Sequence, residues 1–289
     1  MTARPIRRGT GHVRRTRPVR RASAGLTPAR AAAIFGMLAS AGAIYGLTAS
    51  SAFGVSHVDV SGAAITGSAT ITDRLGLASG QNLFDIATEP LEAALREIPA
   101  VATADVSIGL PDRVNVTIVE RRPVVVWLVG QRRLLVDERG FLFAELAPDA
   151  APPAMVDALP VITDNRAAAA NLSIGRTLDA VDLDAAFRLA SLTPAQVGSS
   201  AAGLAVSVTD TNGFVVSSGP GGWEAIFGFY VLSLRTPDLI PGQVQLLKTL
   251  LAGREPLVKT VILADDREGT YIPKAAPAES PGASPAQEP

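Results

Sequence analysis

Few residues in this chain have the side-chain chemistry that catalysis needs. Its 289 residues include no cysteine and two histidines, His12 and His57, which excludes a thiol nucleophile, a disulfide framework and a zinc–thiolate site. His12 stands among arginines, so a Ser-His-Asp triad would have to use His57. His57 and Asp59 alternate with Val58 and Val60, which instead indicates that His57 lies on the outward face of a short strand. We therefore expect no catalytic residue.

Three acidic or glycine-rich groups resemble sites but lack part of the required pattern. The segment SSGPGGW has the glycines of a phosphate-binding loop without the Lys-Ser or Lys-Thr that should follow. Asp265, Asp266 and Glu268 lack the alternation of a calcium loop and are expected to solvate the exit from a strand. Asp137 and Glu138 are adjacent, which aims them poorly as a catalytic acid and base, so we assign them to a turn. The sequence predicts no metal, no cofactor and no enzyme.

The charges are divided sharply between two parts of the chain. Residues 1–56 contain nine arginines and no acid, whereas the rest carries 17 basic and 27 acidic residues, so the net charge of −1 conceals two opposite ends. The basic segment, residues 1–30, has the composition of a nucleic-acid arm that binds phosphates. It has no aromatic residue for stacking on bases. We therefore interpret it as a cytoplasmic tail attracted to anionic lipid, and expect no nucleic-acid partner.

Residues 31–53 carry no charge and follow the basic segment directly. As a helix this stretch would extend about 34 Å, enough to cross a hydrocarbon core about 30 Å thick. We predict one membrane-spanning helix, with the basic tail in the cytoplasm and the later domains outside. A cleaved secretory signal is the alternative, with Ala49, Ser51 and Ala52 as a peptidase site. The length of the uncharged stretch favours the anchor, because it exceeds the apolar core of a usual signal, about 7–15 residues.

The stretch after this anchor has the pattern of a small domain in which helices cover a sheet. An alternating strand at 58–60 precedes two amphipathic helices, with Ser68 and Thr88 as their expected N-caps. A hairpin follows, because two further alternating runs, 103–108 and 114–118, flank the turn GLPD. The predicted order is strand, helix, helix, strand, strand, with both helices on one face of three strands.

The stretch ERRPVVVWLVGQRRLLVDERGFLF begins a second, β-rich domain. Pro123 favours an extended Arg122, so the chain should leave the first domain as a strand. The two apolar runs then pair across a short polar loop, and Asp137 and Gly140 fit the first and fourth positions of a type I turn. Beyond a Pro- and Ala-rich crossing segment, the patterns predict helices at 181–192 and 243–251, strands at 204–208, 214–217 and 258–263, a further segment at 223–230, and a distal strand at 269–273.

Together these patterns predict an α+β chain made of five parts. They are a basic cytoplasmic tail at 1–30, a transmembrane helix at 31–53, a three-stranded domain at 54–122, a β-rich domain with flanking helices at 123–273, and a disordered tail rich in Pro, Ala and Ser at 274–289.

The three-stranded domain resembles the POTRA domain of the FtsQ/DivIB cell-division proteins. The resemblance rests on HVDVSG, then GQNLF, then IPAVATADVSIGLPDRVNVTIVERRPV, in the family's order and spacing. It is dense from Phe53 to Asp137 and continues thinly to about Leu263. A basic tail and one anchor directly before the POTRA domain also follow the family's plan. The resemblance implies a non-enzymatic, single-pass scaffold of the divisome, located in the cell (plasma) membrane at the division septum, that holds septal cell-wall synthesis machinery.

Two other functions share part of this pattern. A POTRA-type polypeptide transport or chaperone module has the same fold, although such proteins usually carry tandem POTRA repeats and a single repeat is visible here. A secreted binding protein or enzyme, released by cleavage of the apolar stretch, is the second alternative.

The resemblance also implies a partner site at the C-terminal sheet edge. In the family this edge docks FtsB/DivIC-like and FtsL-like bitopic proteins; other divisome membrane proteins and the lipid bilayer complete the implied partners. The matching stretch is VKTVILADDREGTYIP, in which Ile262-Leu263-Ala264 replaces the family's Asp-Leu-Arg. An exposed edge accepts a partner strand through main-chain hydrogen bonds, whereas a frayed end would bind nothing. The candidate partner residues are Val261, Leu263, Gly269, Thr270, Tyr271 and Ile272.

Overall fold

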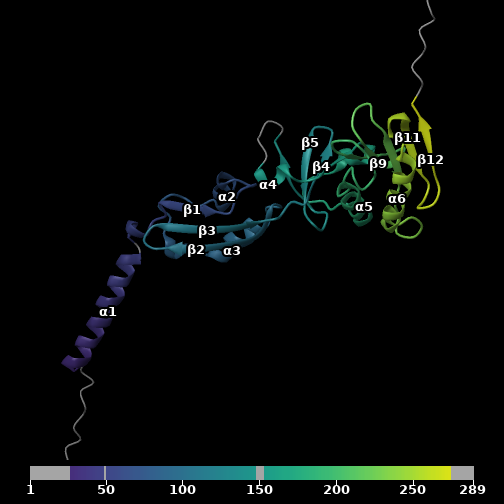
Figure 1. The fold of residues 1–289 in the computed structure, drawn as a ribbon. Helices are drawn as coiled ribbons and strands as arrows, with labels where there is room; N and C mark the ends of the chain where they lie inside the picture. The colour runs from purple at the N-terminus through teal and green to yellow at the C-terminus, as the bar shows by residue number, and fades with distance from the viewer. Residues whose placement is uncertain (1–26, 49, 148–152, 275–289) are drawn as a thin grey trace, which may run out of the picture. The chain divides into compact units, whose positions relative to one another are not determined.

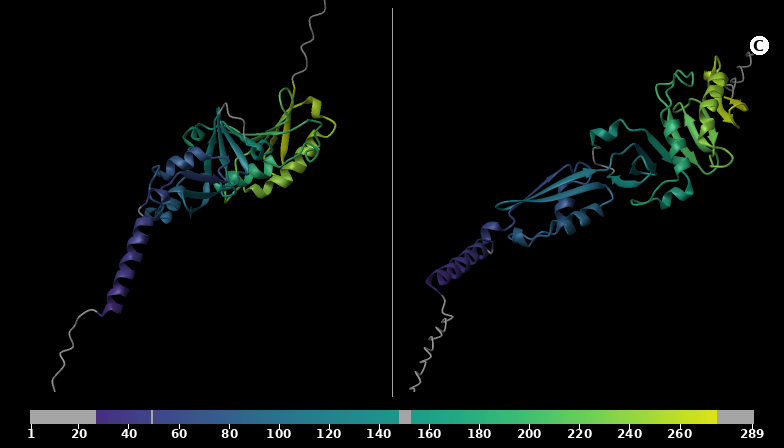
Figure 2. Two further views of the ribbon diagram at one scale, coloured as in Figure 1. Left: turned by 90° about the vertical axis from the view of Figure 1, so that its left-hand side faces the viewer. Right: turned by 90° about the horizontal axis from the view of Figure 1, so that it is seen from below.

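The computed structural model describes residues 27–48, 50–147 and 153–274 (Figures 1 and 2). Its contacts separate the chain into two units, Met1–Ala52 and Phe53–Pro289. The predicted domain boundary between residues 122 and 123 falls inside the second unit and stays a prediction. Nearly all of the predicted basic tail, with His12, and of the predicted C-terminal tail lies outside the described residues.

The first unit contains the helix α1, Pro28–Thr48, which is long and apolar enough to cross a membrane (Figure 1). Its 21 residues correspond to about 32 Å of helix. The helix begins before the predicted residue 31 because a proline suits the first turn, where its missing N–H costs no hydrogen bond. It ends before the predicted residue 53. In its last turn, where carbonyls lack partners within the helix, the Thr48 hydroxyl donates to the carbonyls of Ile44 and Tyr45, at 3.0 and 3.2 Å.

The second unit begins with a three-stranded sheet and two helices. The strands have the spatial order β1-β3-β2, with β1 parallel and β2 antiparallel to β3. This confirms the predicted succession of strand, helix, helix, strand, strand. The elements are β1 His57–Ser61, α2 Ser68–Leu75, α3 Thr88–Arg96, β2 Val101–Gly109 and β3 Arg113–Glu120, with a short 3-10 turn at Leu83–Asp85; another, Ser51–Phe53, spans the boundary between the two units.

The core of this sheet follows the predicted alternation, with local exceptions. Val114, Val116 and Ile118 of β3 are buried with residues of both helices. Ile108, expected beside them, is exposed near the hairpin turn. Both predicted N-caps are wrong, because Ser68 and Thr88 are the first residues of their helices. The caps are Gly67 and Ala87, and neither makes a side-chain capping hydrogen bond.

A nine-stranded sheet forms the rest of the second unit (Figures 1 and 2). Its order is β12-β11-β10-β9-β8-β7-β4-β5-β6, with parallel pairs β4–β7, β7–β8 and β10–β11. The strands are β4 Val125–Val129, β5 Arg132–Val136, β6 Leu142–Leu146, β7 Val161–Asp164, β8 Ala205–Thr209, β9 Gly213–Ser217, β10 Glu224–Gly228, β11 Val258–Leu263 and β12 Gly269–Pro273. The helices are α4 Ala154–Asp157, α5 Ala180–Ala190 and α6 Ile240–Leu251, with 3-10 turns at Ala167–Asn171, Pro237–Leu239 and Glu255–Leu257.

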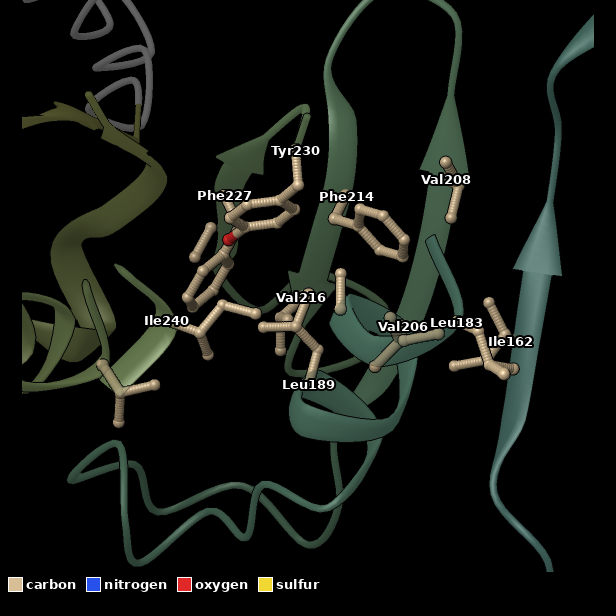
Figure 3. Close-up of a cluster of buried hydrophobic side chains, with 14 of the residues drawn as sticks. Ile162, Leu183, Leu189, Val206, Val208, Phe214, Val216, Phe227, Tyr230 and Ile240 are labelled. Carbon is tan, nitrogen blue, oxygen red and sulfur yellow. The ribbon is translucent and has the colours of Figure 1, made fainter. Parts of the chain in front are cut away.

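The main core lies between this sheet and the helices α5 and α6 (Figure 3). Figure 3 shows side chains from both helices facing a row of strand residues, and it labels Ile162, Leu183, Leu189, Val206, Val208, Phe214, Val216, Phe227, Tyr230 and Ile240. Trp127 and the neighbouring Val125 belong to the same core. The apolar runs of the stretch at 120–143 therefore fill a protein interior, as predicted.

Strand β7 is the strand that sequence reasoning did not find. It directly follows the Pro- and Ala-rich crossing segment. Its four residues, Val161–Asp164, are too few to show an alternating pattern. The strand nevertheless pairs in parallel with both β4 and β8. Without it, the two halves of the nine-stranded sheet would not be joined.

Candidate partner-binding edge

The nine-stranded sheet ends in β6 on one side and β12 on the other, and the two edges differ. The outer edge of β6 is covered at its start by the segment Gly175–Thr177. Leu142 N donates to Arg176 O at 2.8 Å, and Gly175 N donates to Leu142 O at 2.7 Å. All five residues of β12 are exposed, and β12 pairs with β11 alone among the described strands. Among the described residues β12 has no such cover, so it is the more open of the two edges.

The register identifies which backbone groups of β12 face outward. Opposed residues of an antiparallel pair alternate between those that exchange hydrogen bonds and those that do not. Ala264 N donates to Glu268 O at 2.9 Å, which makes the next pair, Leu263 with Gly269, a non-bonded one. By alternation, Thr270 and Ile272 bond to β11. The N–H and C=O groups of Gly269 and Tyr271, and the C=O of Pro273, point away from the sheet.

The side chains of β12 lie on two faces. Gly269 lies against α6, since a Cβ built there would stand 3.1 Å from Leu246 Cδ2 and 3.3 Å from Leu250 Cδ1. Tyr271 shares that face by alternation, and the Arg254 guanidinium lies 5.8 Å from the centre of its ring. Ile272, on the opposite face, is 47% exposed. A partner strand would thus meet apolar side chains on both faces.

Two of the six predicted partner residues need correction. The side chains of Val261 and Leu263, in β11, are 0% and 2% exposed and belong to the main core. They face α5 and α6 because alternate residues of a strand point to the same face. These two residues hold the strand next to the edge, whereas Gly269, Thr270, Tyr271 and Ile272 form the edge itself.

Sequence reasoning also missed the residue that fixes the end of this edge, Arg235. Its guanidinium donates to Phe227 O at 2.6 Å, to Leu263 O at 2.8 Å and to Ala264 O. These carbonyls come from the ends of β10 and β11, so one side chain ties both strands to the turn that precedes β12. Nothing in the local sequence indicates this role, since the partners are up to 29 residues away.

The turn before β12 is acidic, as expected for a strand exit. The N–H groups of Arg267 and Glu268 donate to Asp265 Oδ1 at 2.7 and 2.6 Å, and these hydrogen bonds lower the pKa of the Asp265 carboxyl. Asp266 and Glu268 form no ion pair within the part of the chain that the structure describes. Arg267 and Arg235 balance these acids in part, so the start of β12 carries a net negative charge.

The three-stranded sheet protects one of its own edges with side chains. Val106 N, on the outer side of β2, donates to Glu92 Oε1 at 3.2 Å, and Arg96 Nη2 donates to Ala104 O at 3.3 Å. Both side chains belong to α3. On the other side, β1 leaves an outer edge beside α2, with a groove lined by Val58, Asp59, Val60, Ser68, Ala69, Thr72 and Asp73.

The residues considered for catalysis have structural partners. His57 Nδ1 lies 3.1 Å from Asp112 Oδ2 in the hairpin turn, and the adjacent Ser56 hydroxyl donates to Gly54 O instead of to the imidazole. In SSGPGGW, the Ser218 hydroxyl both accepts from Trp223 N, at 2.8 Å, and donates to Trp223 O. Within the described ranges no cluster of three His, Cys, Asp or Glu residues could hold a metal.

The Asp137 side chain closes the predicted turn and also forms an ion pair. Its Oδ1 accepts from Arg139 N and Phe141 N, at 2.9 and 3.0 Å, while Gly140 N donates to Asp137 O at 2.9 Å. Its Oδ2 accepts from Arg121 Nη1 at 2.9 Å. Arg121 also donates to Pro99 O at 2.9 Å. This arginine, directly after β3, therefore joins the end of that strand to the Asp137 turn.

Comparison with known proteins bears directly on this architecture. A family model described as "POTRA domain, FtsQ-type" matches residues 53–121. "Cell division protein FtsQ" of Chloroflexus aurantiacus is 28% identical over 225 residues, which cover 77% of this chain and 71% of that protein. The protein of that name from Chloroflexus aggregans is 35% identical over 156 residues, or 52% of this chain and 54% of the relative. The chain is therefore similar to FtsQ cell-division proteins over most of its length, and its residues 53–121 match the FtsQ-type POTRA domain.

A further relative carries the same name. "Cell division protein FtsQ" of Streptomyces bingchenggensis is 32% identical over 124 residues, covering 42% of this chain and 47% of that protein. The chain thus combines an FtsQ-type POTRA domain, an apolar N-terminal helix and a β-rich region, and its similarities support a role as a cell-division protein. These similarities and a helix such as α1 fit a single-pass membrane protein of cell division.

Proposed function

We propose that this chain is a non-enzymatic, single-pass scaffold of the divisome, and that a partner protein binds it by adding a strand to β12. The observation that supports the proposal is the contrast between edges: β6 is covered at its start and β2 bonds to side chains of α3, whereas β12 presents outward backbone groups along an exposed strand. Natural proteins usually blunt such an edge, because an unpaired edge recruits other strands. A bare edge in a protein that works through partners is a binding feature.

The geometry defines the length of the added strand. The outward N–H and C=O groups of Gly269 and Tyr271 offer two donors and two acceptors, and Pro273 adds an acceptor without a donor. Hydrogen bonds of this kind contribute about 0.5–1.5 kcal/mol each. Proline ends the ladder because it has no N–H. The partner segment should therefore be short, with further affinity from side chains beside Tyr271 and Ile272.

The partners proposed for this edge are the FtsB/DivIC-like and FtsL-like bitopic division proteins, which place short extracytoplasmic segments near the same membrane. The helix α1 would anchor the chain in the cell membrane with residues 1–30 in the cytoplasm and both sheets outside, at the septum. The outer edge of β1, with its groove beside α2, is the surface proposed for other membrane-proximal division proteins. In this arrangement the chain links these proteins to septal wall synthesis.

A backbone substitution tests strand addition more directly than a side-chain substitution. Tyr271→Pro removes an outward N–H while leaving the bonds from Thr270 and Ile272 to β11, and an edge strand tolerates proline where its N–H faces solvent. Tyr271→Val is the matched control, because it removes the ring but keeps the N–H and a high strand propensity. The affinity of each full-length variant in detergent micelles for the organism's purified FtsB/DivIC-like protein would be measured by titration.

We expect Tyr271→Pro to weaken binding about two- to tenfold relative to Tyr271→Val, with equal thermal unfolding of the two variants. Equal affinity of the two variants would show that the partner does not bond to this edge.

Depletion of the protein from cells should give filaments without septa; normal division, in the absence of a second copy, would contradict the divisome role.

A further inference from the structure

The loop between β10 and α6 exposes large apolar side chains to solvent. Leu232 and Leu234 are 81% and 89% exposed, the highest values among the large apolar side chains in the described ranges. Phe229 and Val231, in the same loop, are 49% and 47% exposed. We call residues 229–234 the leucine loop. Exposing two leucines in this way forgoes about 1.5–3 kcal/mol of burial for each, so a monomer gains nothing from them.

The leucine loop is held firmly at both ends. Val231 N donates to Arg235 O at 2.9 Å and closes the loop, and the Arg235 side chain donates to the three carbonyls at the ends of β10 and β11. Tyr230 is buried, and its hydroxyl donates to the buried Gln243 Oε1 at 2.7 Å. A partner that meets Leu232 and Leu234 would therefore find them already positioned, which lowers the entropy cost of binding.

We propose that the leucine loop is a second contact for the polypeptide that adds to β12, and that it receives the segment of that polypeptide that continues past Gly269. This inference rests on the proposed function. Arg235 bonds to Leu263 O and Ala264 O, at the turn from which β12 starts, so the loop and the strand edge meet the same end of the sheet. Adjacent strands lie about 4.8 Å apart, which places an added strand about 15 Å from β10. Five extended residues cover that distance.

The charges between the two surfaces specify the chemistry of the partner. Asp265, Asp266 and Glu268 stand at the turn that such a segment must cross, against Arg267 and the Arg235 guanidinium bound to Ala264 O, so the turn keeps a net negative charge. A matching segment would carry lysine or arginine first and leucine-like side chains after them. The same acids oppose contact with anionic lipid headgroups, because like charges repel. The surface therefore fits a basic, apolar polypeptide in preference to a membrane.

Photo-crosslinking in living cells tests this arrangement with the full-length protein. A photoreactive benzoylphenylalanine would replace Leu232 in one strain, Thr270 in a second and Thr249 in a third. Thr270 reports on the β12 edge, and Thr249 is an exposed control on α6. We expect positions 232 and 270 to capture the same protein, at different peptides, and the peptide captured at position 232 to contain a basic residue and large apolar residues. Position 249 should capture neither.

The outcomes separate this inference from the function on which it rests. Capture at position 270 with no protein at position 232, or with lipid alone there, would overturn the inference and leave strand addition intact. No capture at position 270 would contradict strand addition itself, and with it this inference. A different protein at position 232 would overturn the shared-partner arrangement.

Affinity measurements give a second, independent readout. The double substitution Leu232→Ser with Leu234→Ser should weaken binding of the purified FtsB/DivIC-like protein at least about tenfold and leave thermal unfolding unchanged, because both side chains are exposed. Leu110→Ser is the matched control, since Leu110 is 61% exposed in the hairpin turn of the three-stranded sheet. Equal affinity of the double variant and the control would contradict the proposal.

Discussion

The indole Nε1 of Trp127 donates a 3.0 Å hydrogen bond to Oδ2 of Asp164, which joins the neighbouring parallel strands β4 and β7 through buried side chains. Arg166 completes the arrangement, with Nε 3.0 Å from Asp164 Oδ1 and Nη2 2.8 Å from Oδ2. Its Nη1 also donates to Asp182 Oδ2 at 2.6 Å, and these two carboxylates raise the pKa of the guanidinium. Both oxygens of the buried Asp164 carboxylate therefore accept hydrogen bonds.

We expect Asp164→Ala to lower the free energy of unfolding by about 3–5 kcal/mol, because it leaves a buried indole N–H without an acceptor and removes one carboxylate from a partly buried guanidinium. Urea unfolding of the full-length protein in detergent, followed by circular dichroism, measures the loss. Asp105→Ala is the control, as Asp105 is exposed on β2 and should change stability by less than about 0.5 kcal/mol. Equal losses for both variants would show that the Trp127–Asp164 bond adds no stability.

Gly62, the glycine of the HVDVSG motif, has two separate reasons to be glycine. Its φ is +84°, and a Cβ built on it would stand 1.9 Å from Ile118 O. We expect Gly62→Ala to cost at least about 3 kcal/mol, since a backbone atom of a buried strand would have to move. Gly76→Ala is the matched control: its φ is +61° but the space around it is open, so strain of about 1–2 kcal/mol is the whole cost. A similar melting temperature for both variants would contradict the steric argument.

The extent to which sequence predicted this fold depends on the range of the interactions. The strands β11 and β12 match the predicted ranges 258–263 and 269–273 residue for residue, because alternation and turn residues are local signals. The four residues of β7 gave no such signal, and their neighbours β4 and β8 are distant in sequence. The exposed edge was predicted from the family resemblance, but the inward position of Val261 and Leu263 required knowledge of which face α6 covers.

The leucine loop shows a further limit of sequence reasoning. No role was predicted for Leu232 and Leu234, because apolar side chains usually are buried and residue type alone does not indicate exposure. Their exposure follows from the Arg235 hydrogen bonds to strand ends that lie far away in the chain, which hold the loop outside the core. Partner surfaces of this kind become visible after the sheet has been assembled.

Glu255 is expected to make stability depend on acid pH. Burial alone would raise the pKa of its carboxyl, but hydrogen bonds from the Ser199 hydroxyl, from Ser200 and from Trp223 Nε1 outweigh burial and lower the pKa to about 2. The folded-state pKa therefore lies below the ordinary value of 4.5. Its stabilising contribution is complete above pH 4.5 and is lost as the pH falls towards 2.

The measurement compares the wild-type protein with Glu255→Gln. The wild type should be the more stable at neutral pH, and the difference in free energy of unfolding should shrink as the pH falls from about 5 to about 2.5. Glu138→Gln provides the control, because Glu138 is exposed in a turn and should follow the wild-type profile throughout. A Glu255→Gln difference that stays constant across this range would show that the hydrogen bonds do not favour the carboxylate.

The helix α1 leads to a prediction that separates an anchor from a cleaved signal. An uncleaved anchor predicts that the chain stays in the membrane pellet after alkaline carbonate washing and keeps residues N-terminal to Ala52; a mature N-terminus near Ala52 would favour the secreted alternative.

Leu38 lies at the middle of Pro28–Thr48, and this helix contains many Ala, Gly and Ser residues that contribute little apolar area. An arginine at the centre of a spanning helix costs about 2.5–3.5 kcal/mol. Leu38→Arg should therefore move much of the protein out of the carbonate-resistant fraction, whereas Leu38→Ala, which adds no charge, should not. Retention of both variants would indicate that α1 does not span the bilayer alone, and that the two sheets bind the membrane or its proteins independently of the helix.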